Sequence, residues 1–266
     1  MSNTGATYVY GILGSLYNSV PVTIESCINY GDIVLKQDWD SAAGISTYPD
    51  EFVTIKKCAN YGTITAGTAY GICDSMGSMT DTCPPTSATI EDCANYGDIS
   101  SNYFSAGITG RIGVMKRCIN LGHITATYNA APEGKNDSVR SIAYYVEHKS
   151  GLYYLVGDLA ESNGIDEVVG APLTLQEFSS QSNLKEFDFK TVWTMGKVND
   201  NTVPVLGVPT EKTQACRSRF YQQMNYIIKY YFMQYIFTFY FGNFLPIGAQ
   251  TEGFPPVGRY NKIIGV

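Results

Sequence analysis

Cysteine and carboxylate side chains recur at fixed places in the first half of this chain, inside a phrase that occurs four times. The copies are 23–33 (TIESCINYGDI), 54–64 (TIKKCANYGTI), 89–99 (TIEDCANYGDI) and 114–124 (VMKRCINLGHI). Their cysteines are Cys27, Cys58, Cys93 and Cys118. Thiols could bind zinc or act as nucleophiles, but the sequence has no C-x-x-C pair and only two histidines, so both chemistries lack their usual partners. We therefore predict no metal site, no cofactor and no catalytic residue, and expect a buried cysteine column.

Two carboxylates, Asp32 and Asp98, occupy the same place in copies one and three. If the copies stack as coils about 4.8 Å apart, the two side chains are about 10 Å apart. That separation is at the upper edge of the range for an inverting glycosidase, although aspartate is also a common turn residue. His123 fills the same column in copy four, where we expect a surface turn. A second group of acidic residues could offer calcium ligands: Asp38, Asp40, Asp50 and Glu51.

The repeat predicts the architecture, because each copy must adopt the same backbone and stack on its neighbour. A looser phrase, Tyr/Ala-Gly-Ile, precedes each copy and begins at Tyr10, Ala43, Tyr70 and Ala106. Successive repeat cysteines are 31, 35 and 25 residues apart. A unit of this length, rich in Gly, Thr and β-branched residues, favours short strands over paired helices. We predict an all-β fold, a right-handed parallel β-helix of about four to five coils.

The corners of this β-helix can also be placed. Ile24 and Cys27 lie three residues apart, so two consecutive residues between them must face outward if both point into the core. Stacked coil on coil, the first corner column is Glu25, Lys56, Glu91 and Lys116, and the second is Ser26, Lys57, Asp92 and Arg117. Signs alternate along the first column, and opposite charges on neighbouring strands stabilise by about 0.2–1 kcal/mol per pair. The charges therefore predict in-register stacking independently of the phrase.

Asparagine and glycine form the next two columns. The asparagines are Asn29, Asn60, Asn95 and Asn120, and the glycines are Gly31, Gly62, Gly97 and Gly122. Asparagine can bond to backbone groups at a turn, and stacked asparagines can bond to one another as a ladder. For the glycines we expect a positive φ, which a Cβ would penalise. Both columns are interpreted as structural.

The variable loops hold the candidate ligand contacts. Aromatic residues on them could stack on sugars or contact a protein, although loop packing is the simpler interpretation: Trp39, Tyr48, Tyr103 and Phe104. Cys73 and Cys83 lie in the longest loop, where they could form a disulfide if the protein is exported.

After Ile124 the phrase fades, and 141–155 (SIAYYVEHKSGLYYL) is interpreted as a degenerate last coil or a capping hairpin. Thr174 and Glu177 form a capping box that predicts a short helix. Phe187, Phe189, Val192 and Trp193 are expected to seal the core, and Asn199–Asn201 to form a turn. We predict a repeat domain at 1–155, a small α/β capping segment at 156–213 and an aromatic tail at 214–266.

Charge and composition exclude some functions. The net charge is −6, which disfavours nucleic-acid binding. Residues 221–241 are dense in Tyr, Phe and Ile; a membrane span, an interfacial or packed helix, and a non-native read-through all remain open for the tail, so membrane contact is expected only if the tail is native. Met1–Ser15 lacks the features of a signal peptide, and we expect the chain to be a fragment of a longer protein.

The phrase C-x-N-x-G-x-I, alternating with Tyr/Ala-Gly-Ile, resembles the GLUG-motif repeats of bacterial surface proteins, including those of gut bacteria. The resemblance covers about 10–124 and extends more loosely to the W-x-M…V-P-V-L ending at 193–206. It implies a non-catalytic extracellular or cell-surface module for display or adhesion, with a host or bacterial glycan or protein as partner. The alternative is a β-helical domain that binds or cleaves polysaccharide.

Overall fold

The computed structural model describes residues 8–14, 21–38, 40–46, 52–74, 87–127, 139–157 and 169–207. The chain divides into two units, Met1–Cys216 and Arg217–Val266. Every residue of the second unit lies outside the described ranges, as does the predicted aromatic tail. The boundaries predicted at 155 and 213 therefore stay predictions.

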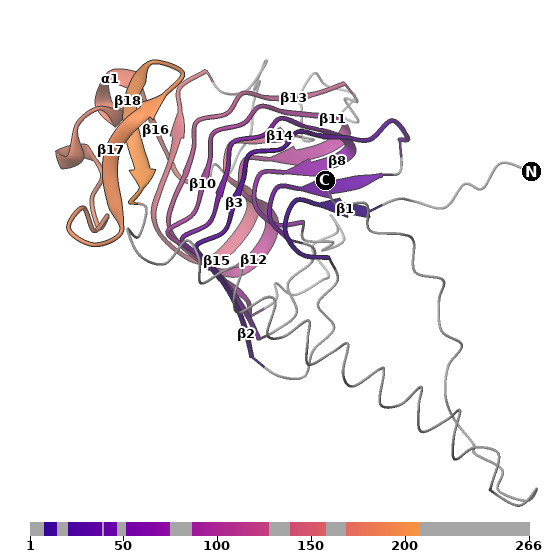
Figure 1. The fold of residues 1–266 in the computed structure, drawn as a ribbon, viewed down its shortest axis with the longest axis horizontal. Coiled ribbons are helices and arrows are strands. Elements are labelled where there is room, and N and C mark those ends of the chain that lie inside the picture. The colour runs from indigo at the N-terminus through magenta and orange to yellow at the C-terminus, as the bar shows by residue number, and fades with distance from the viewer. Residues whose placement is uncertain are drawn as a thin grey trace, which may run out of the picture. The chain divides into compact units, whose positions relative to one another are not determined.

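The described chain is an all-β parallel solenoid of about three turns with almost no helix (Figure 1). One seven-stranded sheet contains β1 (Tyr8–Tyr10), β4 (Ile33–Val34), β5 (Ser41–Ala43), β8 (Ile64–Tyr70), β11 (Ile99–Ala106), β13 (Ile124–Ala126) and β14 (Val139–Arg140). A nine-stranded sheet contains β2 (Val22–Glu25), β3 (Ile28–Asn29), β6 (Val53–Lys56), β7 (Ala59–Asn60), β9 (Thr89–Glu91), β10 (Ala94–Asn95), β12 (Thr109–Asn120), β15 (Ala143–Leu155) and β16 (Ala171–Leu173).

The four copies of the phrase stack in parallel and in register. Ile24 lies opposite Ile55, Ile55 opposite Ile90, and Ile90 opposite Met115. The second half of the phrase continues the same register, with Asn29 opposite Asn60. The segment 141–155 continues the stack: β15 pairs with β12 and places Leu152 opposite Cys118 and Tyr154 opposite Asn120.

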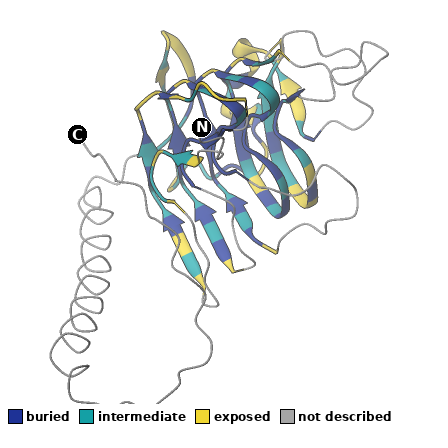
Figure 2. Cartoon of the chain, turned by 90° about the vertical axis from the view of Figure 1, so that its right-hand side faces the viewer, coloured by how far each residue is buried: buried dark blue, intermediate teal, exposed yellow. Residues whose placement is uncertain are grey.

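The core is the interior of the solenoid, where apolar residues from successive coils form continuous columns (Figure 2). Ile and Cys both point inward although they are three residues apart, because the backbone turns between them. The turning residue is the second one of each corner, with φ near +50°: Ser26, Lys57, Asp92 and Arg117. In β15 the matching position is Gly151, whose φ is +59°. Left-handed backbone at one fixed position thus produces the corner in every coil.

A small cap packs beside the last coils. Helix α1 (Leu175–Phe178) begins with the predicted capping box, in which Thr174 accepts from the backbone of Glu177 and Glu177 bonds back to Thr174. A 3₁₀ turn η1 (Gln181–Asn183) leads to the antiparallel hairpin β17 (Trp193–Val198) and β18 (Asn201–Leu206). The predicted turn lies between these two strands, with Asn199 and Asp200 in the left-handed region.

The cap buries its own apolar cluster against the solenoid. Phe178, Leu184, Phe187, Trp193 and Val203 are buried together with Ala94 and Ile119 of the repeat. Tyr96 of copy three donates its hydroxyl to the Pro204 carbonyl at 2.7 Å. These contacts cover the outer face of the second half of the phrase, at Ala59, Ala94 and Ile119. The expectation that the cap aromatics seal the end of the core is therefore wrong, because they form a cluster separate from the interior of the solenoid.

Candidate functional site

The asparagines form a continuous ladder through the stacked coils. Each Nδ2 donates to the carbonyl of the glycine two residues later, and those of Asn29, Asn60 and Asn95 also donate to Oδ1 of the asparagine in the next coil. The three inter-coil bonds, from Asn29 to Asn60, Asn60 to Asn95 and Asn95 to Asn120, are each 2.8 Å long. Since each amide uses its donors inside the stack, this column holds coils together.

The repeat cysteines also bond within the stack. The Sγ atoms of Cys58, Cys93 and Cys118 each lie 3.3 Å from the carbonyl two residues earlier, and 3.7–3.9 Å from an isoleucine carbonyl of the preceding coil. All three side chains are fully buried thiols. Burial raises the pKa of the Cys93 thiol well above its usual value. A nucleophilic or metal-binding cysteine needs an environment that favours the thiolate, which is the opposite of the one around Cys93.

The prediction of positive φ at the repeat glycines is wrong: Gly31, Gly62, Gly97 and Gly122 do not adopt the left-handed region. Glycine is required for another reason, which is contact between coils. A Cβ on Gly97 would lie 2.0 Å from the Gly62 carbonyl oxygen, and one on Gly62 would lie 2.0 Å from that of Gly31. Only a residue without a side chain lets successive corners approach so closely.

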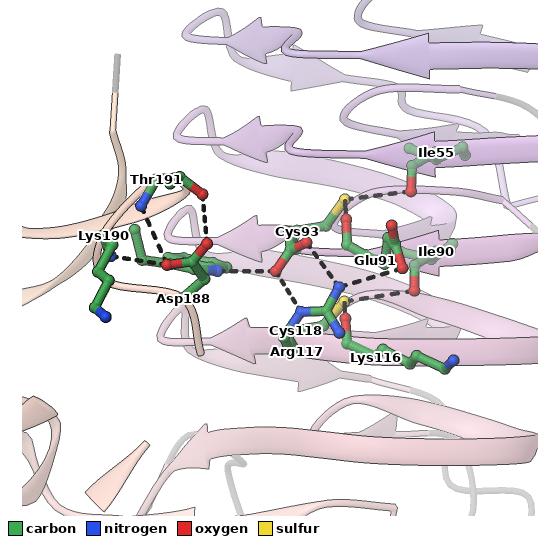
Figure 3. Close-up of polar contacts among 12 residues, drawn as sticks. Ile55, Ile90, Glu91, Cys93, Lys116, Arg117, Cys118, Asp188, Lys190 and Thr191 are labelled. Atoms are coloured by element: carbon green, nitrogen blue, oxygen red, sulfur yellow. Dashed lines mark hydrogen bonds and ion pairs between the residues drawn. The ribbon is translucent and has the colours of Figure 1, made fainter. Parts of the chain in front are cut away.

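The corner charges stack as expected in the first column, and ion pairs also run diagonally. Glu25 pairs with Lys56 at 3.4 Å and with Lys57 at 3.3 Å. Arg117 pairs with Glu91 at 3.2 Å, and Figure 3 shows its guanidinium reaching across to that coil. The carboxylates beside Arg117 raise the pKa of its guanidinium. These partly exposed pairs contribute modestly to stability.

Asp92 departs from the outward orientation expected of a corner residue. It is buried, and it accepts from Arg117 Nε at 2.7 Å and from Trp193 Nε1 of the cap at 3.0 Å. The neighbouring cap turn is held by Asp188, whose Oδ1 accepts from the backbone of Lys190 and Thr191 (Figure 3). The corner of copy three is therefore the anchor of the cap, and the sequence of the repeat alone does not show this role.

The two candidate catalytic aspartates lie in one column, since the isoleucines that follow them are in register through Ile64. Each accepts a hydrogen bond from the backbone of the next coil: Asp32 Oδ1 from Thr63 at 2.7 Å and Asp98 Oδ1 from His123 at 2.8 Å. The backbone N–H of Thr63 lowers the pKa of Asp32. A glycosidase needs one carboxyl with a raised pKa to act as general acid, and Asp32 is shifted the other way.

A buried carboxylate that the sequence did not single out is Asp74. Its Oδ2 accepts from Ser41 Oγ at 2.6 Å and from Tyr10 Oη at 3.2 Å, while Oδ1 is buried and has no hydrogen-bond partner among the described residues. Burial raises the pKa of Asp74, and the two hydroxyl donors offset part of that rise. Ser41 lies two residues before the Tyr/Ala-Gly-Ile phrase that begins at Ala43, and Asp74 lies two residues after the end of the phrase that begins at Tyr70. An aspartate stands at that place in one copy alone, so the repeat does not indicate this contact.

Two of the four candidate ligand contacts lie within the described residues. Tyr103 and Phe104 are half-buried on β11, and Phe104 packs edge-on against Tyr144 at 6.3 Å between ring centroids. Trp39 and Tyr48 lie outside the described residues. A different aromatic set is stacked: Tyr30 on Tyr61 at 5.1 Å and Tyr61 on Tyr96 at 4.5 Å.

The acidic residues proposed for calcium are engaged elsewhere or not described. Asp38 accepts from the Asn102 amide and Asp40 from the Gln37 backbone, whereas Asp50 and Glu51 lie outside the described residues. Within the described ranges no group of three or more His, Cys, Asp or Glu side chains is arranged to hold a metal ion. The partner predicted for Cys73, Cys83, also lies outside them.

Comparisons with protein-family models, with curated proteins and with solved structures gave no match to this chain. In the part of the chain that the structure describes, no helix is long and apolar enough to cross a membrane. The segment 221–241, for which a span was considered, lies outside that part.

Proposed function

We propose that this chain is a non-catalytic extracellular repeat module, used for display or adhesion at a cell surface. The supporting observation is that the recurrent polar side chains of the repeat bond to neighbouring coils of the same chain. The asparagine amides bond to the next coil, and the Asp32 carboxylate and the Cys93 thiol bond to the backbone of a neighbouring coil. Because these polar side chains bond between coils, they stabilise a rigid spacer, and ligand binding is left to the variable loops.

We further propose that the solenoid is right-handed and has four to five coils when β15 is counted as the last. Right-handed crossover is the strong preference for parallel strands joined within one sheet. The pairing of β15 with β12 supports the count.

Membership of the GLUG-motif repeat group is part of this proposal, as is an extracellular or cell-surface location. The partner we propose is a glycan or protein of a host or bacterial surface. The acidic balance of the chain supports this choice over nucleic acid. Polysaccharide cleavage by Asp32 and Asp98 is the weaker alternative, because both carboxylates are held by the backbone of the adjacent coil.

Arrays of surface glycans and extracellular proteins, probed with the labelled full chain, test the proposal. We expect saturable binding to one ligand class that weakens when Tyr103→Ala and Phe104→Ala are combined, with unchanged circular dichroism. As a matched control, Tyr145→Ala removes another exposed aromatic from β15 and should leave binding unchanged. Absence of binding to both classes would contradict the adhesive role.

A further inference from the structure

Copy one of the phrase forms an edge of the solenoid. Among the described strands, β2 pairs only with β6, β3 only with β7 and β4 only with β8. The Asn-Tyr-Gly corner of this copy is open to solvent: Tyr30 is 71% exposed and Gly31 is exposed, whereas Gly62, Gly97 and Gly122 are buried. Val34, beside this corner, is 60% exposed. Exposed edges with apolar side chains are templates for another strand.

The asparagine, tyrosine and glycine columns of the phrase each present an unfilled position at this edge. In the ladder, Asn60 Oδ1 accepts from the amide of the coil before it, but Asn29 Oδ1 accepts only from the Gly31 backbone among the described residues. Tyr30 stacks on Tyr61 through one ring face and exposes the other. At Gly31 the nearest atom to an added Cβ is 3.6 Å away, where the equivalent position at Gly62 meets a carbonyl at 2.0 Å.

The donor-to-acceptor direction of the asparagine ladder and the alternating corner charges determine how a docked strand must be oriented. Two copies of the chain joined edge to edge would bring two Asn29 Oδ1 acceptors together, and two Glu25 carboxylates. A parallel coil instead brings an amide donor to Asn29, as each coil does for the next. It also brings a residue opposite Glu25, and the alternation along that column requires a cation there.

We propose that the edge of copy one is a docking surface for a parallel strand segment that carries the same phrase, with a cationic side chain at its third position. The segment is supplied by a second polypeptide. Its asparagine donates to Asn29, its tyrosine stacks on Tyr30, and its lysine or arginine faces Glu25. Binding of this kind adds strands to a sheet edge through backbone hydrogen bonds, with the side-chain columns setting the register.

Peptide titration onto the full chain tests the proposal, with fluorescence anisotropy as the readout. The probe is a labelled peptide with the chain's own residues 53–65, VTIKKCANYGTIT, which places Lys56 opposite Glu25. A control peptide carries Lys56→Glu, and a control chain carries Gly31→Ala, whose added Cβ would meet the glycine carbonyl of the docked segment as a Cβ on Gly62 meets that of Gly31. We expect saturable one-to-one binding of the probe, about fivefold weaker binding of the Lys56→Glu peptide, and at least about tenfold weaker binding of the probe to the Gly31→Ala chain.

Charge exchange on the chain provides the decisive comparison. The Glu25→Lys chain, checked for fold by circular dichroism, should bind the Lys56→Glu peptide better than the unmodified probe. Tyr30→Ala in the chain should weaken binding of the probe, while Tyr145→Ala on β15 should leave it unchanged. The proposal is overturned if the probe does not bind, if the Gly31→Ala chain binds the probe as well as the native chain, or if Glu25→Lys leaves the peptide preference unchanged.

Discussion

Replacing Asn95 by alanine removes the centre of the asparagine ladder. Asn95 donates to Gly97 and Asn120 and accepts from Asn60, each at 2.8 Å, and its side chain is fully buried. Three hydrogen bonds at about 1 kcal/mol each, with about 1 kcal/mol more for polar atoms left in a dry interior, give a loss of about 4 kcal/mol. Because a domain of this kind is stable by only about 5–15 kcal/mol, the loss is large.

The matched control is Asn29→Ala, the same substitution in the edge coil, where Tyr30 and Gly31 are exposed and water can reach the Gly31 backbone groups that lose their partner. We expect it to cost about 1–2 kcal/mol. The measurement is urea unfolding followed by circular dichroism, with equal slopes required before the two free energies are compared. If Asn95→Ala costs no more than Asn29→Ala, the ladder does not hold the coils together and the reasoning is refuted.

Three further predictions rest on single contacts. Gly97→Ala places a Cβ 2.0 Å from the Gly62 carbonyl and should lower the free energy of unfolding by about 3 kcal/mol, whereas Gly31→Ala, with open space, should be nearly neutral; equal urea midpoints would contradict the close-contact explanation. The pKa of Asp74 is raised in the folded state. The stabilisation that its protonated form gives the folded state is therefore complete below its unfolded pKa of about 3.9, and it is lost as the pH rises through the folded-state pKa. Asp74→Asn should therefore gain stability relative to the native chain between pH 4 and pH 7 in urea melts, and a pH-independent difference would argue against this. Trp193→Phe removes the donor to Asp92 and should destabilise by about 1–2 kcal/mol, measured by thermal unfolding; an unchanged melting temperature would show that the cap is anchored by packing alone.

The repeat phrase was sufficient to place strands in parallel register, because a column such as Glu25, Lys56 and Glu91 is readable from sequence once the copies are aligned. It was not sufficient to assign the left-handed backbone. Glycine is the usual carrier of positive φ, yet the corner uses Lys57 and its equivalents. The aligned position in β15 is Gly151, and that glycine was an available signal.

Contacts between segments that are far apart in the chain were not readable from the phrase. Asp92 is buried because Trp193 lies 101 residues later and packs over its corner. Asp74 is buried because Tyr10 and Ser41 meet it from two other coils. Neither Trp193 nor Asp74 recurs with the repeat, so periodicity carries no information about these contacts.

The central proposal is that the repeat carboxylates Asp32 and Asp98, which bond to adjacent coils, are structural and not catalytic. Incubation of the full chain with a panel of polysaccharides, followed by quantitation of released oligosaccharides, tests it most directly when Asp98→Ala is run beside the native chain. We predict no release by either protein, and a lower unfolding midpoint for Asp98→Ala because the His123 backbone loses its acceptor. Release by the native chain that disappears in Asp98→Ala, with an unchanged unfolding midpoint, would contradict the account.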